Sequence, residues 1–299
     1  MIIRLCFVEK KYFYPVIATK NNNRYLMNMH TPLQVLRLLF TGGVVLLLFS
    51  CGTDEVPDIY VDQRMETVDD DGNNIIRQRY LDAVGICEDA GKKVSGLSKK
   101  EIDLLGTRRY RLSIHKDKIV QRVESWGFGM TGHYVNPGEC RFELTFEGNL
   151  TVRTPGRTVV YDLKDGVISE DEAGIPEAFR LFFEPVPVPK SLQDSLETMS
   201  SEEDILLGQP VLRWTRTDGS RETIWSAGTQ WGFWEVPTEN MFASTESIVL
   251  EAERKRSFYT MRITTQQFTV GAPLPNLEDG LPAAVQGKDE VPHGKTDTP

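Results

Sequence analysis

The sequence predicts an α+β protein that is mainly antiparallel β, a curved sheet or half-barrel with a few short helices packed on one face. Apolar and polar residues alternate in many short runs, and Gly, Asn or Pro separates these runs. Alternation of this kind with frequent turn signals is typical of antiparallel strands. The runs come in the order strands, helices, strands, without the repeated strand–helix rhythm that a parallel sheet requires.

Composition and charge are those of an ordinary globular chain, with 40% hydrophobic and 26% charged residues. The 34 basic and 43 acidic residues give a formal charge of −9. Six of the basic residues and only one acidic residue lie in the first 50 positions, so the rest of the chain is still more acidic. Phosphate backbones repel such a surface, and nucleic acids are therefore excluded as partners.

The first elements of the body are two helices followed by strands. Residues 75–90 have helical spacing, and Ser98 with Glu101 forms a capping box for a second, shorter helix that Gly106 ends. From Thr107 the apolar residues recur at every second position. We expect strands at 107–114, 118–125, 141–146, 150–153 and 158–163, with turns at 147–149 and 154–156.

The central segment is expected to be helical, with short helices at 176–184, 191–199 and 201–207. A second β block begins at Val211, where Asp218-Gly219 between alternating runs predicts a hairpin. In this interpretation Trp214 and Trp225 lie on one face and pack together. Further strands are expected at 229–236 and within 247–270.

The chain divides by composition into five parts. Residues 52–74 are polar and acidic, and the last 29 residues are rich in Pro and Gly, so neither stretch is expected to bury enough surface to fold. Residues 1–26 are expected to be an upstream extension from a misassigned start, and residues 27–50 a signal peptide. Residues 51–74 are expected to form a flexible acidic tether, and residues 271–299 a disordered tail. Between them, residues 75–270 are expected to form a β-rich domain, with two lobes at about 75–175 and 205–270 as one option.

The segment before Cys51 is expected to be an export signal; a plain signal peptide with an incidental Cys, or an N-terminal membrane helix, is the alternative to a lipoprotein signal. Arg37 precedes an uncharged run at 38–49, which is too short as a helix to cross a hydrocarbon core of roughly 30 Å. Leu48-Phe49-Ser50-Cys51 resembles the lipobox of bacterial lipoproteins. The resemblance implies that acyl chains such as palmitate are attached at Cys51 and hold the protein on a membrane. Because Gly52 is not the Asp that marks inner-membrane retention, it further implies the outer membrane, on its periplasmic or surface side.

The two cysteines of the body, Cys87 and Cys140, are expected to form a disulfide, as isolated pairs in exported proteins do. Two buried free thiols or a metal pair are the alternatives. The chain has no CxxC spacing and only four histidines, so we expect no metal site and no cofactor.

The aromatic residues Trp214, Trp225, Trp231 and Phe233 are the candidate ligand site. On an open sheet face they could stack on sugars or line an apolar groove. The alternative is that they form the sheet core, where large aromatic residues are usually found. Trp234 is expected on the other side of its strand from Trp231 and Phe233.

No motif predicts catalysis. Gly127–Gly132 matches GxGxxG, but no helix is expected after it to hold a pyrophosphate, so we interpret it as a loop between strands. Neither HExxH nor GxSxG occurs. The leading hypothesis is a non-enzymatic envelope lipoprotein with a binding or assembly role. A lipid or other apolar ligand on the concave face of its sheet is one option for what it binds. A carboxylate-dependent hydrolase of envelope polysaccharide and a protein-partner subunit, such as an immunity or complex component, are the alternatives.

Overall fold

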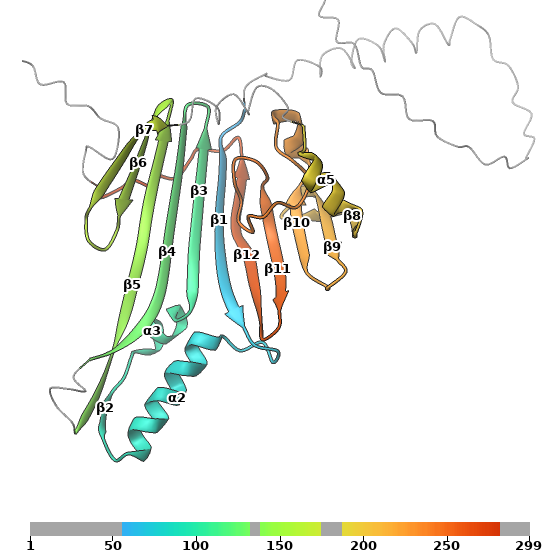
Figure 1. The fold of residues 1–299 in the computed structure, drawn as a ribbon. Coiled ribbons are helices and arrows are strands. Elements are labelled where there is room, and N and C mark those ends of the chain that lie inside the picture. Colours follow the sequence, from blue (N-terminus) through green and yellow to red (C-terminus); the bar gives the residue numbers. More distant parts are fainter. Residues whose placement is uncertain (1–55, 132–137, 175–186, 282–299) are drawn as a thin grey trace, which may run out of the picture. The chain divides into compact units, whose positions relative to one another are not determined.

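The computed structural model describes residues 56–131, 138–174 and 187–281, and within these ranges the protein is mainly antiparallel β. Its strands form one sheet of twelve strands in the order β7-β6-β5-β4-β3-β1-β12-β11-β10-β9-β8, with β2 added in parallel beside β5 (Figure 1). The outer strands β7 and β8 do not pair, so the sheet is open in the part of the chain that is described. The strands are β1 Ile59–Val68, β2 Lys93–Ser95, β3 Thr107–His115, β4 Lys118–Thr131, β5 Glu139–Thr154, β6 Gly156–Asp162, β7 Ile168–Gly174, β8 Met199–Leu206, β9 Gln209–Arg216, β10 Arg221–Trp225, β11 Val249–Arg256 and β12 Tyr259–Val270.

The central strand, β1, lies in the segment that the sequence assigned to a flexible tether, and for residues 59–68 that prediction is wrong. β1 pairs with β3 on one side and with β12 on the other. Its buried carboxylate, Asp62, is neutralised from the neighbouring strand β3: Arg109 donates two hydrogen bonds to it, at 3.0 and 2.6 Å. A bidentate pair of this kind offsets the burial of the carboxylate. The partner is 47 residues away, so local composition could not reveal it.

The two expected lobes are the two halves of this one sheet. Strands β3–β7 lie on one side of β1 and strands β8–β12 on the other (Figure 1). The joint between the halves is the β1–β12 ladder, whose register shifts by one residue between Asp62 and Gln63. The strands of both expected lobes therefore belong to one continuous sheet.

The segment 226–248, between β10 and β11, packs on the sheet. It starts with the 3₁₀ helix η1, Ala227–Trp231, and buries Phe233, Ala243 and Ile248 in a cluster with residues of β1, β3 and β4. Gln63, on β1, is fully buried, and its side chain joins this segment to the start of β11. Its Oε1 accepts a hydrogen bond from Ala243 N, and its Nε2 donates to the backbone oxygen of Val249, the first residue of β11. The side-chain amide of Gln63 therefore holds segment 226–248 in place, because at a buried position no water can take over a hydrogen bond that is lost.

The C-terminal segment from 271 is expected to be disordered, but its described part, 271–281, packs on the sheet. Leu277 is buried against Tyr60, Leu150 and Val152. Because Tyr60 and Val61 are neighbours on β1, their side chains point to opposite faces of the sheet. Both faces are thus covered near β1, which is why this strand lacks a simple alternating pattern.

The helices are α2 Ile75–Asp89, α3 Lys99–Leu104 and α5 Lys190–Leu196. The expected capping box of α3 is confirmed: Glu101 N donates to Ser98 Oγ, and Ser98 N donates to Glu101 Oε2 at 2.7 Å. Figure 1 shows α2 beyond the start of β3, beside β2. α5 contacts the edge strand β8.

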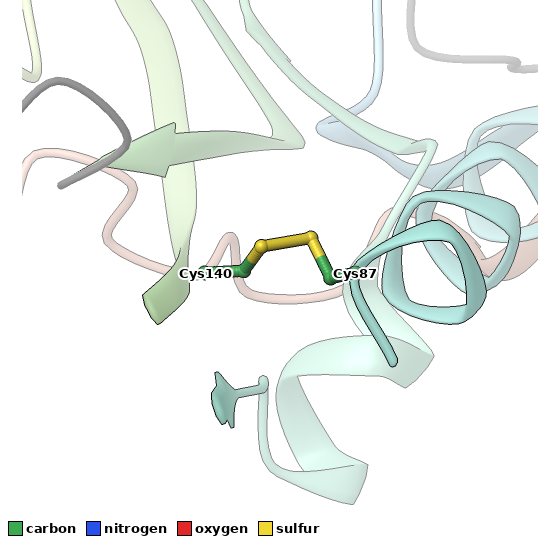
Figure 2. The surroundings of a disulfide bond; sticks show 2 residues. All are labelled: Cys87 and Cys140. Carbon is green, nitrogen blue, oxygen red and sulfur yellow. A yellow bond between two sulfur atoms is a disulfide. The ribbon is translucent and has the colours of Figure 1, made fainter. Parts of the chain in front are cut away.

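The predicted disulfide is confirmed. Cys87, near the end of α2, is bonded to Cys140, near the start of β5, with Cα atoms 6.3 Å apart (Figure 2). The bond lies in a buried cluster with Tyr80, Leu105 and Phe142. It fixes the last turn of α2 to the long β4–β5 hairpin.

Four local predictions are wrong, and in three of them pairing between strands overrides a local pattern. Residues 201–206 belong to β8 rather than to a helix: β8 pairs with β9 along its whole length, and Arg213 on β9 forms ion pairs with Glu202 and Asp204. Residues 147–149 and the glycines before Thr131 are not loops but lie inside β5 and β4. Gly148 allows the close approach of these strands, since a Cβ there would meet Val123 O at 2.9 Å. Residues 229–236 form part of η1 and an irregular stretch rather than a strand.

The remaining expected strands and the turn at 154–156 are confirmed with small shifts at their ends. The predicted helix at 176–184, the extension at 1–26, the signal at 27–50 and Cys51 lie outside the described residues. Among the helices that are described, none has the length and apolar character needed to span a bilayer.

Candidate functional site

The predicted aromatic site is mostly part of the protein core. Trp225 and Phe233 are 1% and 2% exposed, and both contact strand residues of the central sheet. Trp231 stacks on Trp225 with ring centroids 5.6 Å apart, and Phe268 of β12 meets Trp225 edge to face. Protein atoms therefore occupy the ring surfaces that a ligand would need.

Trp214 belongs to a different cluster, and the expected packing of Trp214 against Trp225 is wrong. The β9–β10 hairpin has a three-residue loop, Thr217–Gly219, where a two-residue Asp-Gly loop was expected: Arg216 N donates to Ser220 O, and Gly219 N to Arg216 O. One extra loop residue shifts the register by one position and reverses the facing of every side chain in the partner strand. Trp214 consequently stands opposite Glu222, and its Nε1 donates to Glu235 O at 2.8 Å.

An open pocket of about 840 Å³ lies beside this hairpin. Four parts of the chain line it: α5, the β9–β10 turn, the segment 226–248 and the end of β11. Its volume lies in the range of roughly 300–1,000 Å³ that small-molecule sites have. The residues that give it chemical character are Arg216, Trp234, Asn240, Arg254, Lys255 and Arg256.

A buried carboxylate, Glu222 of β10, organises the arginines of this pocket. Glu222 is 1% exposed, and Arg254 donates to its Oε1 from Nε at 3.0 Å and from Nη2 at 2.8 Å. Arg254 also donates to the backbone oxygens of Thr238 and Glu239, so four hydrogen bonds hold this guanidinium in place. Burial raises the pKa of Glu222, and the two nearby arginines act against that shift.

Arg216 is held more loosely than Arg254. Its Nη2 lies 3.6 Å from Glu222 Oε1, which is an ion pair beyond hydrogen-bond length. Within the described residues, Arg216 Nε and Glu222 Oε2 are buried without a hydrogen-bond partner. Since buried polar atoms are nearly always bonded, this pair keeps unused hydrogen-bonding capacity.

Acidic side chains also lie on the pocket wall. Asp218 belongs to the hairpin turn, where the backbone N–H of Ser220 donates to its Oδ1 at 2.8 Å and lowers its pKa. Glu239 and Glu246 are exposed at the rim. Charges at exposed positions contribute little through water, so the side chains near Glu222 dominate the electrostatics of the pocket.

A second groove, of about 620 Å³, lies on β1, β3, β4 and β5, beside the turn that follows β6. Three carboxylates line it: Glu147, Asp162 and Asp165. The backbone N–H groups of Asp165 and Lys164 donate to Asp162 Oδ1 and lower the pKa of that carboxyl. Across the described ranges, no His, Cys, Asp and Glu side chains are grouped so that they could hold a metal ion.

Sequence reasoning missed the residues of the larger pocket. It placed Trp234 apart from the other aromatic residues, which was a usable signal, since Trp234 lines the pocket whereas Trp225 and Phe233 lie in the core. No local pattern marks Arg216, Glu222 and Arg254, which come from three different strands.

No known family model matches this chain, and no curated protein is similar enough to count as a relative. The class to which it belongs is therefore defined by its fold, an open and mainly antiparallel sheet with a lined pocket at one side.

Proposed function

We propose that this chain is a non-enzymatic lipoprotein of the cell envelope, held in the outer membrane by Cys51, that binds a small ligand in the pocket beside the β9–β10 hairpin. The observation that carries the proposal is the set of incompletely bonded polar groups, Arg216 and Glu222, beneath a lined pocket of suitable size. The lipobox supports the anchor, and the disulfide agrees with an oxidising compartment.

The half-barrel interpretation, with a lipid or other apolar ligand on the concave face, is the finer form of this proposal. The burial of Trp225 and Phe233 by the protein's own side chains gives that form little support. The pocket, whose wall carries charged and amide groups, favours a polar ligand instead.

The anchor is tested by metabolic labelling with a palmitate analogue. Wild-type protein should incorporate the label and sediment with outer membranes, whereas Cys51→Ser should lose both properties. Label retained in Cys51→Ser would place acylation elsewhere and refute the lipobox assignment.

The binding role is tested on the full chain carrying Cys51→Ser, by recording the five indole N–H signals of the tryptophans in NMR spectra during titration with a polar envelope extract. Trp→Phe variants assign each signal. We expect the Trp234 signal to shift and the Trp126 signal, from the second groove, to stay in place. If no indole signal shifts, the binding proposal fails.

The second groove supports one alternative, a carboxylate-dependent hydrolase of envelope polysaccharide. Glycoside hydrolysis needs one carboxyl whose pKa is raised so that it can act as an acid. In this groove the pKa of Asp162 is lowered, which suits a base or a nucleophile rather than the acid. Release of reducing sugar from envelope polysaccharide by wild type, and its loss in Glu147→Gln, would favour the hydrolase over the binding protein.

A further inference from the structure

We propose that the sheet face beneath residues 271–281 is a docking site for an extended segment of a partner protein. Residues 271–281, called the tail segment below, occupy this face as such a partner would. Three observations lead to the proposal: the tail segment lies on the sheet without joining it, two of its side chains make the deep contacts, and the face beneath matches an apolar residue followed by an acid.

The tail segment crosses the sheet without becoming part of it. It leaves the end of β12 and runs towards β6 (Figure 1), and none of its residues belongs to a strand or a helix. Its first residue is fixed by a hydrogen bond from Gly271 N to Asp58 O at 2.7 Å. Pro273 and Pro275 have no N–H group, so this stretch cannot donate the hydrogen bonds of a strand. Side-chain contacts therefore take the place of strand pairing, as they do for many bound peptides.

Two neighbouring residues, Leu277 and Glu278, make the deepest contacts of the tail segment. They are 5% and 8% exposed, whereas the other nine residues of the segment are exposed or half-buried. A few buried anchors within a more exposed contact are typical of binding interfaces. Leu277 packs in a cluster of apolar side chains from β1, β4, β5 and β6: Tyr60, Val120, Leu150, Val152 and Val159.

The sheet face also supplies a cation for the acidic residue that follows the leucine. Lys118, at the start of β4, donates to Glu278 Oε2 and forms an ion pair with it. Arg122 of the same strand donates from Nη1 to the backbone oxygen of Leu277 at 3.3 Å. Glu124, also on β4, is already bonded by two arginines, so Lys118 is left to the acid of the segment. The face therefore recognises an apolar residue followed directly by a carboxylate.

The fit of the tail segment is incomplete where it passes the β3–β4 turn. A pocket of about 240 Å³ remains between residues 274–278 and the sheet, with Ser113, His115 and Val120 on the sheet side. Well-packed protein contacts leave few voids larger than a water molecule. A partner segment with a larger apolar side chain at the position of Leu274 would fill this space. Such a partner would bind better than the tail segment and replace it.

The test is a titration, followed by fluorescence anisotropy, with a labelled synthetic peptide of residues 271–281. The reference chain is the full chain carrying Cys51→Ser. Adding Leu277→Asp to it should release the tail segment, so that the peptide binds at least about tenfold more tightly than to the reference chain, where the segment competes. Leu277→Asp in the peptide should abolish binding, and Glu278→Gln should weaken it about tenfold or more. Leu274→Phe in the peptide should strengthen binding.

The matched control is Phe258→Asp, which introduces the same charge at an 86% exposed residue on the β11–β12 turn. It should change the peptide affinity of the reference chain by less than about twofold, since exposed substitutions away from a contact have small effects. Circular dichroism checks that each variant is folded.

A second variant serves if Leu277→Asp unfolds the chain. Glu278→Lys places two cations together and should also release the tail segment. Lys118→Glu added to Glu278→Lys restores an ion pair, so the tail segment should close again and peptide binding should be lost.

Three results would overturn the inference. The first is equal peptide affinity of the reference chain and a folded released variant, and the second is no binding by any folded released variant. Unfolding of both released variants would count with the second, because the tail segment would then be part of the fold. The third is a reference chain that sediments as a dimer which the peptide dissociates, because the occupant would then be a second copy. None of these results bears on the pocket beside the β9–β10 hairpin, so the two proposals fail separately.

Discussion

Removing the Cys87–Cys140 crosslink should destabilise the protein strongly. The bond joins residues 53 positions apart, and on the chain-entropy relation a loop of this length is worth roughly 4 kcal/mol at 25 °C. For a domain of this size each kcal/mol corresponds to roughly 2–4 °C in Tm. The double variant Cys87→Ala/Cys140→Ala should therefore unfold about 8–16 °C lower than wild type.

Urea unfolding at several temperatures, followed by circular dichroism, measures this loss. Reductant on the wild type separates the crosslink from the packing of the sulfur atoms, because it opens the bond and deletes no atom. Reduced wild type and the double variant should agree closely, and reductant should not affect the double variant. A loss below about 1 kcal/mol in both would refute the reasoning and show that the unfolded chain is already restricted in this region.

The local consequence is equally specific. Cys87 lies in the last turn of α2, whose contacts with β5 lie mainly in the cluster of Tyr80, Cys140 and Phe142. Hydrogen exchange should therefore accelerate in α2 after reduction, while the amides of β1, paired on both sides, stay protected.

Two further predictions concern the other half of the sheet. Gly228→Ala should lower the free energy of unfolding, measured with urea, by about 1–3 kcal/mol, because the new Cβ would stand 2.8 Å from Trp225 and 3.1 Å from Phe233. The control is Gly85→Ala in α2, where the Cβ meets nothing within 4 Å and the free energy of unfolding should rise by about 0.5–1 kcal/mol. Equal effects of the two substitutions would contradict the packing described for Trp225. Burial raises the pKa of Glu222 above its ordinary value of 4.5, so the folded state holds this proton more tightly than the unfolded state does. The stability that it contributes is complete below pH 4.5 and is lost as pH rises through the folded-state pKa, so the unfolding free energy of wild type relative to Glu222→Gln should fall from pH 4.5 upwards. A difference that does not vary with pH would show that the pKa of Glu222 is not raised.

The candidate site illustrates how far sequence reasoning reached. Alternation around Asp218-Gly219 correctly predicted a hairpin, because that signal is local. The sequence did not reveal whether the loop of this hairpin has two residues or three. The extra loop residue decides on which side of the sheet Trp214 lies and what it contacts. Trp225, Trp231 and Phe233 do form one cluster, whereas Trp214 belongs to another. Only the packing of segment 226–248 onto the sheet separated Trp234, at the pocket, from Trp225 and Phe233, in the core.

The sequence by itself determined the features that depend on neighbours along the chain: the capping box at Ser98, the strand from Thr107, and the predominance of antiparallel β structure. It also carried the cysteine pair, since two cysteines leave one possible bond. The capping box and the alternating strand pattern each depend on residues that are only a few positions apart in the sequence.

Only the tertiary structure decided that residues 59–68 form the central strand and that residues 201–207 form an edge strand. Both segments carry acidic side chains, and each is ordered by pairing with other strands: β1 with β3 and β12, and β8 with β9. In β1, the bidentate pair with Arg109 lowers the cost of burying Asp62, but this pair acts only once the sheet has formed. For the same reason the pocket around Glu222, built from three strands and a covering segment, exists only in the folded chain.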